Sequence, residues 1–361
     1  MHREHAEART MAKTPFIVTV DTEGDDLWSR PREITTRNAA YLPRFQTLCE
    51  RFGVKPVYLT NYEMAMSDVF VEFARDVVAR RAGEIGMHLH AWNSPPLDPL
   101  TTDDFHHQPY LTEFPESVMR EKVKAITAIL EDRFGEKMIS HRGGRWAFDG
   151  RYASILLDAG YRVDCSVAPG FSWRAIPGAP TGNGGPDYRT FPRGPYFLRS
   201  SDVSRPASEG LLEVPVTTRV SNLYRAAPWL YGIRLVRRFA HRASPAVALL
   251  CPVQPAIRAP VARHLDVMLR LARAARSEGA PYLEFMVHSS ELMASGSPTF
   301  RSQADIECLY EHLEMLFEEL SAWCDSTTLA EFYELYTSAR PRREGAEAYP
   351  ARRPGARAAV S

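Results

Sequence analysis

The chain of 361 residues predicts an α/β fold, in which crossover helices cover a parallel sheet. Short apolar runs rich in β-branched residues alternate with longer amphipathic runs, and no internal repeat interrupts this order. The 44 Lys and Arg residues balance 44 Asp and Glu residues, so the total charge gives no overall attraction to nucleic acid. No segment approaches the roughly 20 apolar residues of a membrane-spanning helix.

Seven strands are expected, and each is a short apolar run followed by polar residues. In order along the chain they are 16–21, 56–60, 84–90, 138–142, 161–165, 211–216 and 282–288. The amphipathic runs predict helices, one of which opens at Pro115 and closes near Gly135, as helix caps favour. The expected helices are 38–52, 67–82, 115–134, 148–159, 262–278, 302–323 and 328–337.

The elements predict a single domain over residues 15–337. Residues 1–14 are charged and have no apolar stretch before Phe16, which excludes a secretory signal and indicates a flexible N-terminus. Residues 338–361 are rich in Arg, Pro and Ala without periodicity, so we expect a disordered tail. The five cysteines are scattered without CxxC spacing, which is typical of reduced packing residues and favours a cytoplasmic protein.

Two connections are much longer than usual, residues 92–114 and 166–210. The second carries aromatic residues among glycines and prolines, which either form a stacking wall for a ring-shaped ligand or pack the loop itself. His106 and His107 lie in the first, and they either reach a site or are ordinary surface histidines.

A basic block is hidden by the neutral total charge. No acidic residue lies between Glu213 and Asp266, whereas arginines recur throughout. Its 219–242 segment predicts peripheral contact with anionic lipid at the inner membrane face, or phosphate binding. Alternatively, it is a solvated face paired with an acidic helix that carries Asp305, Glu307, Glu311, Glu314, Glu318 and Glu319.

Ionisable residues recur at the carboxyl ends of the predicted strands, where parallel strand and helix folds build their active sites. They are Asp21 and Glu23, His88 and His90, His141 and Arg142, Asp164, and His288. Because residues two apart on a strand share a face, His88 and His90 can present both rings to one point, and Asp21 and Glu23 both carboxylates. Two histidines and a carboxylate form a catalytic zinc set, which leaves the second carboxylate as a base. A structural HxH pair at a strand end is the alternative.

Five segments also carry a resemblance: FIVTVDTEGD (16–25), EIGMHLHAW (84–92), HRGGRW (141–146), YRVDCS (161–166) and FMVHS (285–289). In order and spacing they resemble the motifs of the polysaccharide deacetylases, the NodB-homology proteins of carbohydrate esterase family 4. The resemblance extends over about residues 15–290 and implies a distorted (β/α)7 barrel, here with long loops and extra C-terminal helices.

The resemblance implies roles for individual residues. Asp21 matches the general base, Arg142 the residue that supports it, and His288 the general acid. Asp164 matches the residue that orients the arginine. The metal ligands would be Glu23, His88 and His90, with Asp25 as a substitute for Glu23, and the ion would be divalent, most simply zinc. We expect the substrate to contact Trp92, Arg145, Trp146 and Trp173.

These features predict a metal-dependent hydrolase that removes an N-acetyl or N-formyl group from a sugar, as in a cell-surface polysaccharide or lipopolysaccharide precursor. Two alternatives remain: an amidohydrolase acting on a non-sugar amide or cyclic imide, and a non-catalytic glycan-binding barrel. Nucleic-acid binding through the arginine block is the weakest interpretation, because no recognition motif accompanies it. The oligomeric state has no sequence signal.

Overall fold

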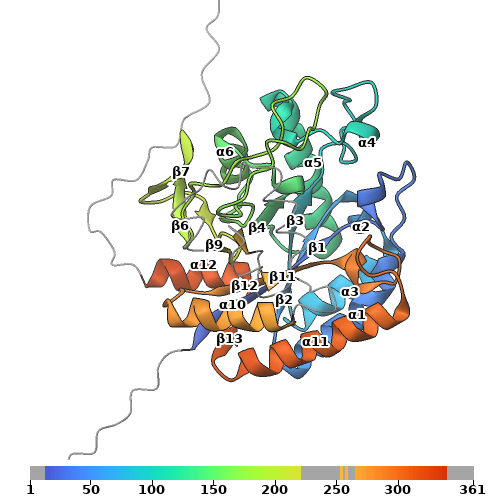
Figure 1. Ribbon diagram of the computed structural model, residues 1–361. Coiled ribbons are helices and arrows are strands. Elements are labelled where there is room, and N and C mark those ends of the chain that lie inside the picture. Colours follow the sequence, from blue (N-terminus) through green and yellow to red (C-terminus); the bar gives the residue numbers. More distant parts are fainter. Residues whose placement is uncertain (1–12, 221–252, 255–256, 259–264, 340–361) are drawn as a thin grey trace, which may run out of the picture.

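The computed structural model describes residues 13–220, 253–254, 257–258 and 265–339 (Figure 1). The expectations for 1–14 and 338–361, and the basic segment 219–242, lie almost wholly outside the described residues. Within the described residues, no helix combines the length and the apolar character needed to cross a membrane.

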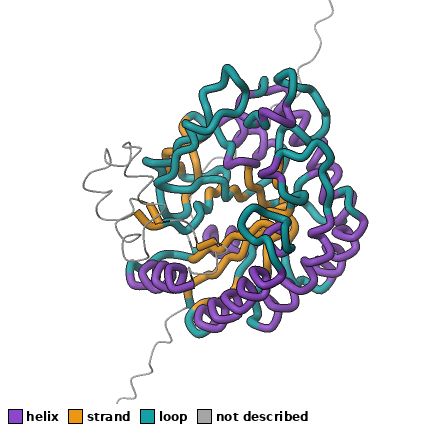
Figure 2. The backbone as a smooth tube through the Cα atoms, turned by 45° about the vertical axis from the view of Figure 1, so that its right-hand side comes forward, coloured by secondary structure: helices purple, strands orange, loops and turns teal. Residues whose placement is uncertain are grey.

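A mixed α/β sheet forms the centre of the molecule, and its strands lie inside a layer of helices (Figure 2). Parallel pairing runs through the order β11-β12-β1-β2-β3-β4-β5-β8. All seven predicted strands are present, which confirms the α/β prediction. They are β1 (Thr14–Thr22), β2 (Pro56–Thr60), β3 (Glu84–Leu89), β4 (Ser140–Gly143), β5 (Val163–Asp164), β8 (Leu212–Glu213) and β12 (Leu283–His288).

Further strands extend this sheet or lie beside it. No strand was predicted in the second long connection. This connection nevertheless forms an antiparallel hairpin of β6 and β7, and β6 also pairs with β8. The additional strands are β6 (Tyr196–Arg199), β7 (Asp202–Ala207), β9 (Arg219–Val220), β10 (Val253–Gln254), β11 (Ile257–Arg258) and β13 (Cys324–Ser326).

The predicted helices are also present, and their ends follow local capping rules. Gly135 adopts a left-handed conformation at the end of α5, and Ser302 caps α11 by accepting from the Asp305 amide. The long helices are α1 (Leu42–Arg51), α3 (Asp68–Ala79), α5 (Glu116–Phe134), α6 (Gly150–Asp158), α10 (Leu265–Ser277), α11 (Gln303–Ser321) and α12 (Leu329–Ser338). Short turns are η1 (Leu27–Ser29), η2 (Arg37–Tyr41), α2 (Tyr62–Ala65), α4 (Asp104–His107), η3 (Leu111–Glu113), η4 (Gly144–Trp146) and η6 (Ser289–Leu292).

The acidic face of α11 is paired with described helices. Glu307 binds Arg44 and Glu314 binds Arg51, both on α1, while Glu319 binds Arg273 on α10. The alternative in which this helix pairs with the basic block falls almost wholly outside the described residues.

The strands alternate between two apolar clusters, and this alternation positions the site. One face of the sheet packs against the outer helices. On the other face, Ile17, Val57 and Val163 cluster with Leu329 and Phe332 of α12, which cover the amino ends of the strands. Because side chains alternate, the same face continues at the carboxyl ends as the polar positions Asp21, Glu23, His88, Arg142 and His288.

Candidate functional site

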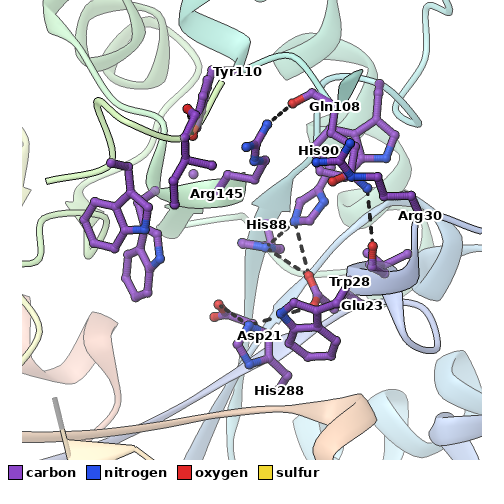
Figure 3. A pocket seen from close by; sticks show the side chains of 16 residues that line it. Asp21, Glu23, Trp28, Arg30, His88, His90, Gln108, Tyr110, Arg145 and His288 are labelled. Atoms are coloured by element: carbon purple, nitrogen blue, oxygen red, sulfur yellow. Dashed lines mark hydrogen bonds and ion pairs between the residues drawn. The ribbon is translucent and has the colours of Figure 1, made fainter. Parts of the chain in front are cut away.

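A cavity of about 380 Å³ opens at the carboxyl ends of the central strands (Figure 3). Such a volume lies in the range of small-molecule sites, roughly 300–1,000 Å³. The cavity has an acidic and imidazole floor and a wall of aromatic and basic residues. Its lining comprises Asp21, Glu23, Leu27, Trp28, Arg30, His88, His90, Trp92, Gln108, Tyr110, Gly143, Arg145, Trp146, Trp173, Ile176 and His288.

Three buried side chains at the floor form a group that could hold a metal ion. One donor atom each from Glu23, His88 and His90 lies within 4.8 Å of the other two. Glu23 Oε2 is 3.2 Å from His90 Nε2 and 3.5 Å from His88 Nε2. The two imidazoles lie on one side of β3 because they are two residues apart, as expected from the sequence.

The hydrogen bond between His88 and the Arg142 carbonyl orients the His88 ring as a metal ligand would be oriented. His88 Nδ1 is 2.9 Å from the carbonyl oxygen of Arg142, which can only accept, so Nδ1 carries the proton. In the neutral imidazole the lone pair is therefore on Nε2, the atom that faces Glu23 and His90. A metal-bound histidine has this arrangement, with its second nitrogen donating to a carbonyl or carboxylate.

Packing holds the His90 ring. Its centroid is 4.3 Å from that of Trp92, and the ring rests on Gly144, where any side chain would collide with it. Gly144, directly after β4, therefore gives His90 the room it occupies. Its neighbour Gly143 has no room for a Cβ either, because that atom would meet the Ala147 carbonyl.

Asp21 is held by a buried arginine. Arg142 Nη1 donates to Asp21 Oδ1 at 2.6 Å and to Thr19 Oγ1 at 3.0 Å, and its Nη2 binds Glu284. Burial raises the pKa of Asp21, but Arg142, His88 and His288 outweigh burial and lower it overall. Burial likewise acts to raise the pKa of Glu23, and the surrounding histidines lower it well below its usual value.

His288 lies across from Asp21 in the register of β12 and β1. Its Nε2 is 3.7 Å from Asp21 Oδ2 and 3.9 Å from Glu23 Oε1, so it faces the floor of the cavity. Its Nδ1 is 3.1 Å from Glu291 Oε2, and the Trp28 ring packs against it edge-on at 4.9 Å. The carboxylate of Glu291 therefore fixes the ring in this orientation.

The structure corrects the role expected for Asp164. Its Oδ1 lies 2.6 Å from His141 Nδ1, and it also accepts from the Ser166 amide and hydroxyl. The arginine is paired with Glu284 instead. The reason is strand register, since Asp164 stands beside His141, whose side chain points to the opposite face from that of Arg142.

Asp25 and the loop histidines are not brought to the group. The Asp25 carboxylate accepts from the Thr35 hydroxyl and from the backbone and side chains of Arg37 and Asn38, which uses its oxygens. Glu23 alone supplies the carboxylate of the three-residue group. His107 binds Thr101, and neither His106 nor His107 lines the cavity.

The four residues expected to contact substrate all line the cavity. Trp146 and Trp173 stack with centroids 5.7 Å apart, so the second long connection supplies part of the wall. Other aromatics of this connection pack the loop itself, since Tyr188 is buried against Phe191 and Phe171 stacks on Trp173.

Sequence reasoning missed several residues around the site. Glu284 lies within the apolar run of β12, four residues before His288, and a lone glutamate there was an available signal. Glu291 opens the turn after that strand. Trp28, Arg30, Gln108 and Tyr110 are brought in by loops, for which the spacing gave no signal.

Two solved structures share this architecture. A Mycobacterium smegmatis protein assigned as a polysaccharide deacetylase matches with a TM-score of 0.50 at 14% identity, covering 95% of this chain and 97% of its own. A Parabacteroides distasonis protein assigned as a glycoside hydrolase/deacetylase matches with a TM-score of 0.51 at 12% identity, covering 92% and 74%. No protein-family model and no curated protein matches the sequence. The chain thus has the fold of these deacetylase-type structures, the fold that the sequence resemblance implied.

Proposed function

We propose that this protein is a metal-dependent hydrolase that removes an N-acyl group from a sugar. The observation that carries the proposal is the juxtaposition at one cavity floor of three candidate ligands, Glu23, His88 and His90, with Asp21 and His288 beside them. Two histidines and a carboxylate that leave a coordination position open suit a catalytic divalent ion, with zinc as the simplest candidate. The shared fold and the ordered motifs are consistent with this chemistry.

A divalent ion held by the three residues supplies Lewis-acid activation of the acyl carbonyl and of water. Asp21 then serves as general base and takes a proton from the attacking water while the oxygen–carbon bond forms. Arg142 keeps the carboxylate aimed into the cavity, because its guanidinium is itself fixed by Glu284, Thr19 and the Cys165 carbonyl.

His288 serves as general acid. Its Nε2 faces the cavity and donates the proton that the sugar amine needs as the carbon–nitrogen bond breaks. Its Nδ1 is held by Glu291, so the ring cannot turn Nε2 away. The base and the acid thus come from neighbouring strands, β1 and β12, and reach the reacting amide from two positions.

The aromatic wall supports a sugar as substrate. Trp28, Trp92, Trp146 and Trp173 line one cavity, and flat aromatic faces pack well against the apolar faces of sugar rings. We expect an acetyl or formyl amide on the sugar. A cell-surface glycan precursor would fit this chemistry.

The test is turnover of N-acetylated and N-formylated monosaccharide derivatives by the zinc-loaded protein, measured as released acetate or formate. Asp21→Asn and His288→Ala should each lower kcat by about 10²- to 10⁴-fold while circular dichroism stays unchanged. Turnover of small cyclic imides but of no sugar amide would contradict the sugar assignment. Full turnover in either variant would contradict the assigned roles.

A further inference from the structure

The wall of the cavity carries two arginines whose charges the described residues do not neutralise. Arg30 and Arg145 both line it, and neither forms an ion pair with a carboxylate among the described residues. In Figure 3 they lie above the group formed by Asp21, Glu23, His88 and His288. The acidic floor cannot serve as their partner, because Asp21 is engaged by Arg142 and Glu23 by the two histidines.

Neutral groups hold Arg145 in place. Its guanidinium donates to the carbonyls of Gln108 and Pro177 and stacks on Tyr110, with Cζ 4.1 Å from the ring centroid. Carbonyl acceptors and an aromatic face fix the orientation without an ion pair to a carboxylate among the described residues. The nearby carboxylate of Glu113 accepts hydrogen bonds from the backbone amides of Tyr110 and Ala179.

Arg30 is fixed in a similar way. It ends the turn η1, where its amide bonds the Leu27 carbonyl, and its Nη1 donates to the His106 carbonyl at 2.6 Å. Both arginines have left-handed backbones, with φ of 56° for Arg30 and 55° for Arg145. Non-glycine residues rarely adopt this conformation, and it concentrates at ligand sites.

The two charges also repel each other. Burial lowers the pKa of Arg145 and Arg30 lowers it further, against the raising effects of Tyr110 and Glu113. Two fixed cations on one cavity wall are stabilised by an anion between them, and each retains N–H donors that no described acceptor uses.

We infer that the substrate carries a phosphate group next to the N-acylated sugar, and that Arg30 and Arg145 bind this phosphate. A phosphate offers several oxygens and up to two charges, which suits two guanidiniums better than a single carboxylate does. The inference rests on the proposed function for the sugar itself. It names the substrate class as a sugar phosphate or a sugar phosphodiester.

The test compares N-acetylglucosamine 1-phosphate with N-acetylglucosamine in calorimetric binding to zinc-loaded His288→Ala protein, in which turnover is blocked. We expect the phosphate to tighten binding by about 10- to 100-fold, the range of charge-assisted hydrogen bonds. Adding Arg30→Gln and Arg145→Gln should bring the two affinities to within about twofold of each other. Adding Arg120→Gln, an exposed arginine paired with Asp158 on α6, should leave the preference intact.

A preference for phosphate that survives the double substitution would overturn the inference, because the phosphate would then be bound elsewhere, as at the metal. Equal binding of the two sugars by the parent protein, or binding of neither, would also overturn it. An equal gain with N-acetylneuraminic acid, which carries a carboxylate, would overturn the assignment of phosphate.

Two further ligands distinguish the source of the phosphate. Tighter binding of the uridine diphosphate ester indicates a sugar nucleotide, and tighter binding of a farnesyl phosphodiester indicates a lipid-linked sugar. The outcome is separable from the proposed function. Arginine-dependent phosphate preference without amide hydrolysis would contradict the function alone, and hydrolysis without this preference would contradict the phosphate site alone.

Discussion

His88 and Arg142 are joined by a hydrogen bond from an imidazole to a backbone carbonyl, with Nδ1 and the carbonyl oxygen 2.9 Å apart on neighbouring strands. The same residue, Arg142, sends its side chain to Asp21. One strand position thus orients both a candidate ligand and the candidate base.

The glycine under His90 should be essential for metal binding. Gly144→Ala places a methyl group against the His90 ring and the Leu89 carbonyl, so the ring must move. We expect the affinity for zinc to fall by about 10- to 100-fold, which is the usual effect of removing a residue that orients a metal ligand. Competition with a chromophoric chelator measures this affinity. Gly194→Ala is the matched control, since the atom nearest to a Cβ at this position is Pro281 Cγ, 3.9 Å away, and the backbone of Gly194 is not left-handed. Unchanged zinc affinity in Gly144→Ala would contradict the role given to this glycine.

Glu291 should act as a positioning residue for His288. Glu291→Ala removes the carboxylate oxygen that accepts from both the His288 amide and Nδ1, so the ring loses its fixed orientation. We expect kcat on an N-acylated sugar to fall by at least about tenfold, a part of what general acid catalysis contributes, while KM changes little. Steady-state kinetics measures kcat and KM separately. A rise in KM at constant kcat would show that Glu291 serves binding and not proton transfer.

The buried pair of Arg142 and Glu284 should contribute strongly to stability. Glu284→Gln weakens a charged hydrogen bond in a site that water does not reach while Asp21 still pairs with the arginine, so we expect the free energy of unfolding to fall by about 1.5–3 kcal/mol. Glu307→Gln on the exposed face of α11 breaks an ion pair with Arg44, which water and salt screen, and should lower the free energy of unfolding much less. Urea titrations of the two variants test the contrast, and equal losses would contradict it.

Lys122 should make the free energy of unfolding rise with pH in the alkaline range. Burial lowers its pKa to about 8, against the raising effects of Asp104 and Asp98, although its Nζ donates to the Ser94 and Pro96 carbonyls. The unfolded chain therefore holds this proton more tightly than the folded chain, and stability rises with pH between the two pKa values. From pH 7.5 to 9.5 the free energy of unfolding should rise by about 1–2 kcal/mol more in the parent than in Lys122→Met. Urea titrations at both pH values that give parallel changes would contradict this placement of the proton.

The sequence alone was sufficient for the seven expected strands and for the ionisable residues at their carboxyl ends. The pairs Asp21 with Glu23 and His88 with His90 follow from two-residue alternation, and the structure places them at one cavity. Alternation within a strand is local, so it can be read without knowing which strands are neighbours.

Contacts between residues that depend on strand register or on loop shape could not be predicted from alternation within one strand. Whether Asp164 or Glu284 binds Arg142 depends on which faces of β4, β5 and β12 point inward, and pairing decides this. Arg30 and Tyr110 reach the cavity through irregular loops, whose course depends on tertiary contacts. The role of Gly144 became visible only once the ring above it was placed.

Metal analysis of the purified protein tests the central claim most directly. After dialysis against zinc and then against metal-free buffer, the parent should retain about one zinc ion per chain, as a three-residue catalytic site does. Glu23→Gln, His88→Ala and His90→Ala should each retain far less, whereas Asp25→Asn should retain the parental amount. Absence of zinc from the parent, or parental zinc content in the three ligand variants, would contradict the assignment of this group as the metal site.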